Sequence, residues 1–345
     1  MYTNFFGLKK QPFTLTPDPD FLFMTGKHRD ALAGLTYAVL ERKGFVVLSG
    51  NAGTGKTTLL SRVLSRLPEH LIESSLILNP TLSASEFLEM VMLDFGITDV
   101  PASKAQRLWK LQKFLAQVHQ QGKIALLVVD EAHKLSVEVM EEIRLLGNFE
   151  YASEKFLQIV LLGQCELDDL LNRQDLRQFK QRIALRLYLD PLEPSEVEDY
   201  IRFRWKEAGG AENPPFTPEA VDAIVRWSQG IPRLINSLCD TAMLTAYISG
   251  ARSAGLPCLQ EVARNLGFLE PEQAIPQTPG EASLAAAAAN HRGLKLVNPP
   301  QPASPDHLAG LSPIDHDTDR AAVNGGRRTN ASVLHWIAGK FGFSH

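Results

Sequence analysis

The sequence predicts an α/β protein with a parallel sheet, followed by a smaller domain that contains only helices. Before Pro191, short apolar runs with the length and branching of buried strands alternate with helical patterns. These runs lie at 45–48, 70–79, 124–129, 156–162 and 184–189. After Pro191 only helical spacings remain, at 194–208, 218–229, 234–248 and 259–266. Strands that alternate with helices are typical of a parallel sheet covered by helices.

The helical segments of the first part follow from apolar residues spaced three or four apart. They lie at 28–43, 58–67, 83–95 and 104–121. The third has two candidate N-caps, Thr81 and Ser83, because a hydroxyl oxygen can accept a hydrogen bond from the unpaired N–H groups of the first turn.

The strand at 45–48 leads into a glycine-rich loop with the pattern Gly50-x-x-x-x-Gly55-Lys56-Thr57. The glycines let the backbone fold into a nest of N–H groups, and the next helix adds its positive dipole end. Lys56 can then reach the β- and γ-phosphates of a nucleotide, and Thr57 can hold Mg²⁺. The expected nucleotide-binding residues are Gly50, Asn51, Ala52, Gly53, Thr54, Gly55, Lys56, Thr57 and Thr58.

Two acidic residues, Asp130 and Glu131, follow the strand at 124–129. Functional carboxylates of open α/β sheets lie at the carboxyl ends of strands, where the ligand crevice opens. We expect Asp130 to hold Mg²⁺ through water, and Glu131 to polarise the water that attacks the γ-phosphate. The alternative is that both acids cap a helix that starts near Ser136. His133 completes the letters DEAH, which alone are weak support for a helicase.

Four further residues are candidates for contact with the γ-phosphate. Gln164 follows the strand at 156–162, where it can sense the phosphate or satisfy loop backbone. Arg177 and Arg182 suit either a solvated face or an arginine finger that reaches a neighbour's nucleotide. Arg233 follows a turn between two helices, from which it can point back to the nucleotide or form a surface ion pair.

Composition limits the classes of partner and compartment. The net charge of -4 gives no global field that would favour DNA, RNA or an anionic membrane. The three cysteines, Cys165, Cys239 and Cys258, have no C-x-x-C spacing, so we expect small core residues in a reducing compartment. Neither a secretory signal nor a run of 18 apolar residues occurs, and we expect a cytoplasmic protein without a transmembrane helix.

The two ends of the chain differ from the body. Residues 1–25 are rich in aromatics and prolines, which predicts an extended arm whose aromatic side chains pack on the next domain. This arm can line an adenine pocket or cover core. Residues 271–330 have the composition of a disordered linker. Residues 331–345 predict an amphipathic tail that docks to a partner or a membrane surface, or packs on the body.

Residues 1–270 resemble the general secretion pathway protein A (ExeA/GspA-like) group of AAA+ ATPases. The resemblance is carried by the loop at 50–57 together with Phe6-Gly7-Leu8, Pro12-Phe13, Pro17-Asp18-Pro19, Val128-Val129-Asp130-Glu131-Ala132-His133, Leu162-Gly163-Gln164 and Gly230-Ile231-Pro232-Arg233. It implies a five-stranded parallel core at 26–190, a helical lid at 191–270, and nucleotide held between neighbouring subunits. It also implies that Gln164 is the sensor on the fourth core strand and Arg233 the lid sensor. Arg182 or Arg177 resembles the finger.

The resemblance implies an ATPase that uses ATP and Mg²⁺, self-associates, and drives or regulates assembly of a cell-envelope secretion machine. We expect a membrane-associated protein partner and a place in the cytoplasm or at the periphery of the inner membrane. Relatives in secretion often carry a transmembrane helix and a peptidoglycan-binding module after the ATPase, and neither pattern follows here. Shorter relatives are similar to ATPases of exopolysaccharide export or pilus biogenesis. The alternative is a DNA-associated regulator that resembles transposition ATPases.

Overall fold

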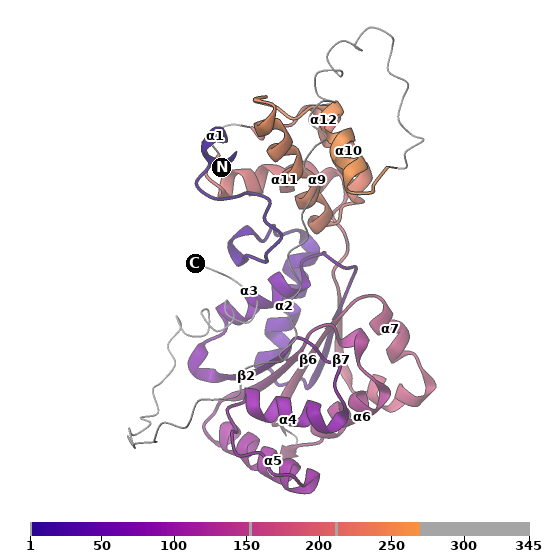
Figure 1. Ribbon diagram of the computed structural model, residues 1–345. Coiled ribbons are helices and arrows are strands. Elements are labelled where there is room, and N and C mark those ends of the chain that lie inside the picture. The colour runs from indigo at the N-terminus through magenta and orange to yellow at the C-terminus, as the bar shows by residue number, and fades with distance from the viewer. Residues whose placement is uncertain (1, 152–153, 211–212, 270–345) are drawn as a thin grey trace, which may run out of the picture. The chain divides into compact units, whose positions relative to one another are not determined.

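The computed structural model describes residues 2–151, 154–210 and 213–269, and it confirms the α/β fold (Figure 1). The main sheet has five parallel strands in the order β2-β3-β6-β1-β7. The strands are β1 (Phe45–Ser49), β2 (Ile72–Ile77), β3 (Ile124–Val129), β6 (Leu157–Gly163) and β7 (Ile183–Tyr188). Each of the five predicted strands is confirmed to within about two residues at its ends.

Helices cover both faces of this sheet, which explains why its central strand β3 is apolar throughout. Phe45 and Val47 of β1 join a core cluster with α4, α5 and α6, whereas Val46 and Leu48 join a second cluster with α2 and α3. Figure 1 shows these two groups of helices on opposite sides of the strands. The helices are α2 (Gly26–Leu40), α3 (Lys56–Arg66), α4 (Ala84–Asp94), α5 (Lys104–Gln120) and α6 (Val137–Leu146).

Shorter elements connect the core. Between the two candidate caps for α4, the structure selects Ser83, which forms a capping box with Glu86. The antiparallel pair formed by β4 and β5 was not predicted, because its strands are only two residues long. The short elements are η2 (Glu69–Leu71), η3 (Ala132–Lys134), β4 (Glu150–Tyr151), β5 (Glu154–Lys155), α7 (Glu166–Leu171), η4 (Gln174–Leu176) and α8 (Arg177–Lys180).

The helical lid is also confirmed. It consists of α9 (Pro194–Glu207), α10 (Pro218–Ser228), α11 (Pro232–Ile248) and α12 (Leu256–Asn265). A proline stands in the first turn of each helix, where its missing N–H costs no hydrogen bond. Leu238, Cys239 and Met243 of α11 are fully buried in the lid core. The boundaries at 26–190 and 191–270 remain proposals.

The N-terminal arm is not extended at its start, so that prediction is wrong. Residues Tyr2–Phe6 form helix α1, which Gly7 ends with a φ of 72°. A second short turn, η1 (Pro19–Phe21), follows later in the arm. The arm also packs on a different partner, because Tyr2, Phe13 and Phe21 belong to the lid core and not to the sheet domain that follows in sequence.

The linker at 271–330 and the amphipathic tail at 331–345 lie outside the described residues. Within the described ranges up to residue 269, no helix combines the length and hydropathy that crossing a bilayer requires.

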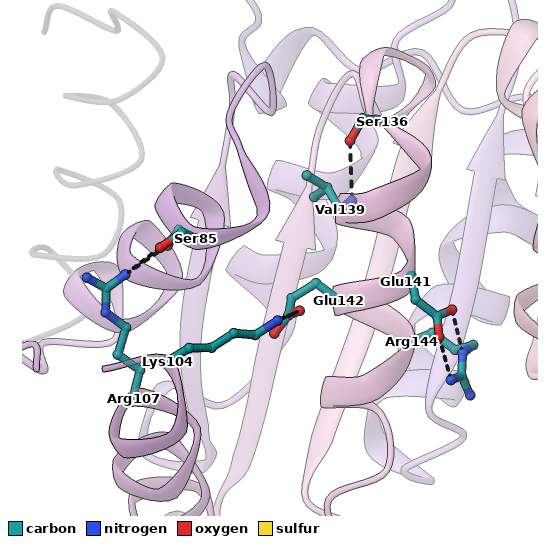
Figure 2. A network of polar contacts seen from close by, with 8 residues as sticks. All are labelled: Ser85, Lys104, Arg107, Ser136, Val139, Glu141, Glu142 and Arg144. Carbon is teal, nitrogen blue, oxygen red and sulfur yellow. Dashed lines mark hydrogen bonds and ion pairs between the residues drawn. The ribbon is translucent and has the colours of Figure 1, made fainter. Parts of the chain in front are cut away.

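An ion pair between the half-exposed Lys104 and the buried Glu142 connects α5 to α6, as Figure 2 shows. The Lys104 ammonium donates to Glu142 Oε2 at 2.6 Å, and Glu142 is only 3% exposed. The other carboxylate oxygen of Glu142 has no hydrogen-bond partner among the residues that the structure describes. The Lys104 ammonium therefore offsets the energetic cost of burying the Glu142 carboxylate.

We expect Lys104→Met to lower the free energy of unfolding by about 1–3 kcal/mol, because it leaves a buried carboxylate unpaired. Urea denaturation followed by circular dichroism measures the change. Lys110→Met is the matched control, since Lys110 pairs with the exposed Asp99 at 2.7 Å, and it should leave the midpoint almost unchanged. Equal shifts in the two variants would contradict the assignment.

Candidate nucleotide site

The glycine-rich loop between β1 and α3 has the backbone of a phosphate-binding nest. Gly50, Gly53 and Gly55 have φ values of 153°, 81° and 97°, which residues with side chains rarely adopt. At Gly50 an added Cβ would lie 2.2 Å from the Leu189 carbonyl oxygen. The loop therefore packs against the end of β7 in a way that only glycine permits.

Helix α3 begins at Lys56, two residues earlier than predicted, and the left-handed Gly55 is its N-cap. No side chain of the described residues caps this end. The first N–H groups of a helix have no partner within the helix, and they carry its positive dipole end. Since Lys56, Thr57 and Thr58 line a cleft, the unpartnered end of α3 opens into it.

Lys56 is 7% exposed and lies within the loop. Its ammonium donates to the carbonyl oxygens of Gly50 and Asn51, each at 2.8 Å. Burial lowers the pKa of Lys56, and the carboxylates of Asp130 and Glu131 oppose this effect. The positive charge of Lys56 therefore lies within the glycine-rich loop, where the sequence predicts that phosphates bind.

Asp130 follows β3 and contacts the first turn of α3. Its Oδ2 accepts a hydrogen bond from the Thr57 hydroxyl at 2.9 Å. Desolvation raises the pKa of Asp130. Hydrogen bonds from the Glu131 N–H and from the Thr57 hydroxyl lower this pKa, but by less. The two residues predicted to hold Mg²⁺ are thus in direct contact, although they lie 73 positions apart in sequence.

Glu131 has a left-handed backbone, with a φ of 54°, which is uncommon for a residue with a side chain. Desolvation opposes ionisation of Glu131, but the ammonium of Lys134 and smaller effects of His133 and Gln164 outweigh it and lower the pKa of this carboxyl. The interpretation of both acids as caps of α6 is wrong, because the Ser136 hydroxyl accepts the Val139 N–H at 3.3 Å (Figure 2).

One cleft of about 560 Å³ brings most of the predicted residues together. This volume is within the range of small-molecule sites, about 300–1,000 Å³. The predicted residues that line it are Ala52, Gly53, Thr54, Gly55, Lys56, Thr57, Thr58, Asp130, Glu131, Gln164 and Arg233. Gly50 and Asn51 are not part of this lining, and their carbonyl oxygens accept the hydrogen bonds of the Lys56 ammonium.

Arg177 and Arg182 are not in the described lining of the cleft. Arg182 immediately precedes β7, at the amino end of the strands, whereas the glycine-rich loop follows the carboxyl end of β1. Its guanidinium donates to the Arg144 carbonyl oxygen at 3.1 Å. Neither arginine shares the cleft of its own chain, so the role of a finger in a neighbour's site remains a prediction.

Arg233 links the lid to the glycine-rich loop. Its backbone N–H donates to the Gly53 carbonyl oxygen at 3.2 Å. An added Cβ at Gly53 would lie 2.6 Å from the Cβ of Arg233. The start of α11 therefore rests on the loop, and Gly53 is needed for this approach as well as for its positive φ.

The far part of the cleft contains residues that the sequence analysis missed. Tyr200, Arg204 and Asn236 of the lid line it beside the arm. Arg204 donates to the Tyr200 hydroxyl at 3.1 Å, and Asn236 donates to the Thr14 carbonyl oxygen at 3.3 Å. A basic residue on the apolar face of α9 was the one available signal. The arm itself both lines the cleft, through residues such as Phe21, and covers the lid core.

The expectation for cysteines is confirmed in part. Cys239 is buried in the lid, but Cys165 is exposed, so its prediction as a core residue is wrong. Cys165 follows Gln164 at the end of β6, and its thiol donates to Asn51 Oδ1 at 3.0 Å. The carboxyl ends of parallel strands face the ligand crevice, which explains why this cysteine is not in the core.

Comparison with known proteins shows a family match and a curated relative. Residues 39–171 match the family described as AAA domain. The chain is 42% identical over 253 residues to general secretion pathway protein A of Aeromonas hydrophila. That match covers 73% of this chain and 46% of the relative, so the chain spans about half the length of that protein.

Solved structures share the fold at low identity. The ORC2 protein of Aeropyrum pernix has a TM-score of 0.54 at 15% identity, over 76% of this chain and 75% of that one. Cdc6p of Pyrobaculum aerophilum has a TM-score of 0.59 at 16% identity, over 75% and 74% of the two chains. The chain is therefore a homologue of general secretion pathway protein A, with an AAA domain of the α/β AAA+ fold.

Proposed function

We propose that the protein is an Mg²⁺-dependent ATPase that self-associates and drives or regulates the assembly of a cell-envelope secretion or export machine. The observation that carries the ATPase part is the contact between Thr57 and Asp130, with Glu131 next in sequence. It places a hydroxyl, a carboxylate and a second acid beside the glycine-rich loop, and phosphoryl transfer needs these groups together.

In this proposal the chain supplies positioning and electrostatic stabilisation. The first N–H groups of α3 and the Lys56 ammonium hold the phosphates. The Glu131 carboxylate orients the attacking water and accepts its proton. Gln164 and Arg233, which line the same cleft, contact the γ-phosphate.

The donor atoms at this site fit Mg²⁺. The ion prefers oxygen ligands and is usually held by one or two protein groups together with nucleotide phosphates. Thr57 Oγ1 and Asp130 Oδ2, which lie 2.9 Å apart, would hold the ion. When bound, Mg²⁺ neutralises charge on the β- and γ-phosphates.

The secretion role and the self-association rest on different support. The name of the Aeromonas hydrophila relative, general secretion pathway protein A, supports a role in secretion, with export of exopolysaccharide as a related alternative. A membrane-associated protein is then the expected partner, and the site of action is the cytoplasm or the inner-membrane periphery. Self-association is supported by Arg177 and Arg182, which lie away from the cleft of their own chain and suit a site completed by a neighbour.

We expect Lys56→Ala to raise the nucleotide dissociation constant about 100-fold, because it removes a buried charge-assisted contact to phosphate. Titration with a fluorescent ATP analogue in Mg²⁺ buffer measures the constant. Lys27→Ala is the control, since Lys27 pairs with Asp190 at 2.8 Å outside the described cleft lining. Nucleotide affinity unchanged in Lys56→Ala would contradict the site.

Glu131→Gln separates binding from hydrolysis. The amide keeps the size of the side chain but cannot accept the proton of water, so kcat should fall about 10²–10⁴-fold while nucleotide affinity changes little. Phosphate release at saturating ATP measures kcat, and the same binding titration measures affinity. Hydrolysis at the wild-type rate would refute the role of Glu131.

The DNA-associated alternative has less support in the charges of the described residues. Helix α5 carries four Lys and Arg side chains, and three of them pair with acids. The pairs are Lys104–Glu142, Arg107–Glu89 and Lys110–Asp99. We expect duplex DNA to leave the ATPase rate unchanged. Stimulation that falls steeply with salt would instead favour assembly on DNA.

A further inference from the structure

Two cationic or hydrogen-bonding side chains surround one oxygen of Glu131. Lys134 Nζ lies 3.1 Å from Glu131 Oε2, and His133 Nε2 lies 3.6 Å from the same oxygen. The Lys134 N–H also donates to the Glu131 carbonyl oxygen at 2.9 Å, which closes the turn at η3. The backbone thus brings Lys134 back over Glu131, and both residues line the cleft.

His133 is itself fixed from the neighbouring strand. The Gln164 N–H, directly after β6, donates to His133 Nδ1 at 3.3 Å. Because Nδ1 accepts, the hydrogen of the neutral ring is on Nε2, the nitrogen that faces Glu131. His133 therefore accepts a hydrogen bond from the residue after β6 and places Nε2 near the acid that follows β3.

We propose that Lys134 is a positioning residue that holds Glu131 Oε2 and thereby orients the carboxylate toward the attacking water, with His133 as a second support. This inference rests on the proposed ATPase activity. The pair is half-exposed, with Lys134 51% and Glu131 37% exposed, and exposed pairs contribute little to stability. The ion pair instead orients the Glu131 carboxylate, and orientation matters because one misplaced catalytic group can lower a rate as much as about 100-fold.

The central test compares Lys134→Ala with Lys134→Arg in steady-state ATP hydrolysis. We expect Lys134→Ala to lower kcat roughly 10-fold, with nucleotide affinity within about twofold of wild type, because the nucleotide is held elsewhere. Lys134→Arg keeps a cation on Oε2 and should recover most of the rate. Lys110→Ala, whose ion pair lies outside the described lining, is the matched control and should hydrolyse as wild type.

Glu131→Gln is measured beside these variants and as a double variant with Lys134→Ala. If Lys134 acts through Glu131, the double variant should be no slower than Glu131→Gln alone. An unchanged or raised kcat in Lys134→Ala, a loss of nucleotide affinity, or additive losses would each overturn the proposal. Failure of the ATPase assignment is distinguishable, since Glu131→Gln would then hydrolyse as fast as wild type.

His133→Asn gives a second readout. An asparagine oxygen near the place of Nδ1 can still accept a hydrogen bond from the Gln164 N–H. The shorter side chain has no atom in the place of Nε2 and therefore does not reach Glu131. We expect a kcat between those of wild type and Lys134→Ala, with the melting temperature kept. A rate equal to wild type would remove His133 from the proposal.

Discussion

The hydrogen bond between the Thr57 hydroxyl and the Asp130 carboxylate joins the two halves of the site. Thr57 belongs to the helix after β1, and Asp130 follows β3, while β6 lies between these two strands in the sheet. Both residues follow the carboxyl ends of their strands, and ligand crevices of open α/β folds lie at this edge of the sheet. This contact depends on the parallel strands, which bring the ends of β1 and β3 to the same edge of the sheet. It also depends on the glycine-rich loop, which leads from β1 to Thr57.

Much of the fold could be predicted because its signals are local. β3 is buried on both faces, so its six residues are all apolar, and the acids after it stand out. The glycine-rich loop has a spacing that phosphate binding requires, and it is contained within eight residues. Lys56, Thr57, Asp130, Glu131, Gln164 and Arg233 therefore meet in one cleft as expected.

The contacts that could not be predicted depend on folding at longer range or on exact turn geometry. Arg204 donates to the Pro12 carbonyl oxygen, 192 positions away, and no local pattern indicates such a bond. Lys134 approaches Glu131 only because the glutamate backbone is left-handed and the chain turns at η3. The aromatic arm was expected on the sheet domain, but its buried rings pack in the apolar core of the lid.

The attachment of the arm to the lid determines how mechanical force would travel through the protein. Tyr2 donates to Asp240, and Arg252 donates to the Phe5 carbonyl oxygen at 2.7 Å, so the start of the chain is fastened to α11 and the segment after it. Tension applied through either flank of the described residues would load the helical lid first. It would reach the sheet domain through the covalent segment that joins β7 to α9, and the bond from the Arg233 N–H to the Gly53 carbonyl oxygen would pass part of it to the phosphate-binding loop.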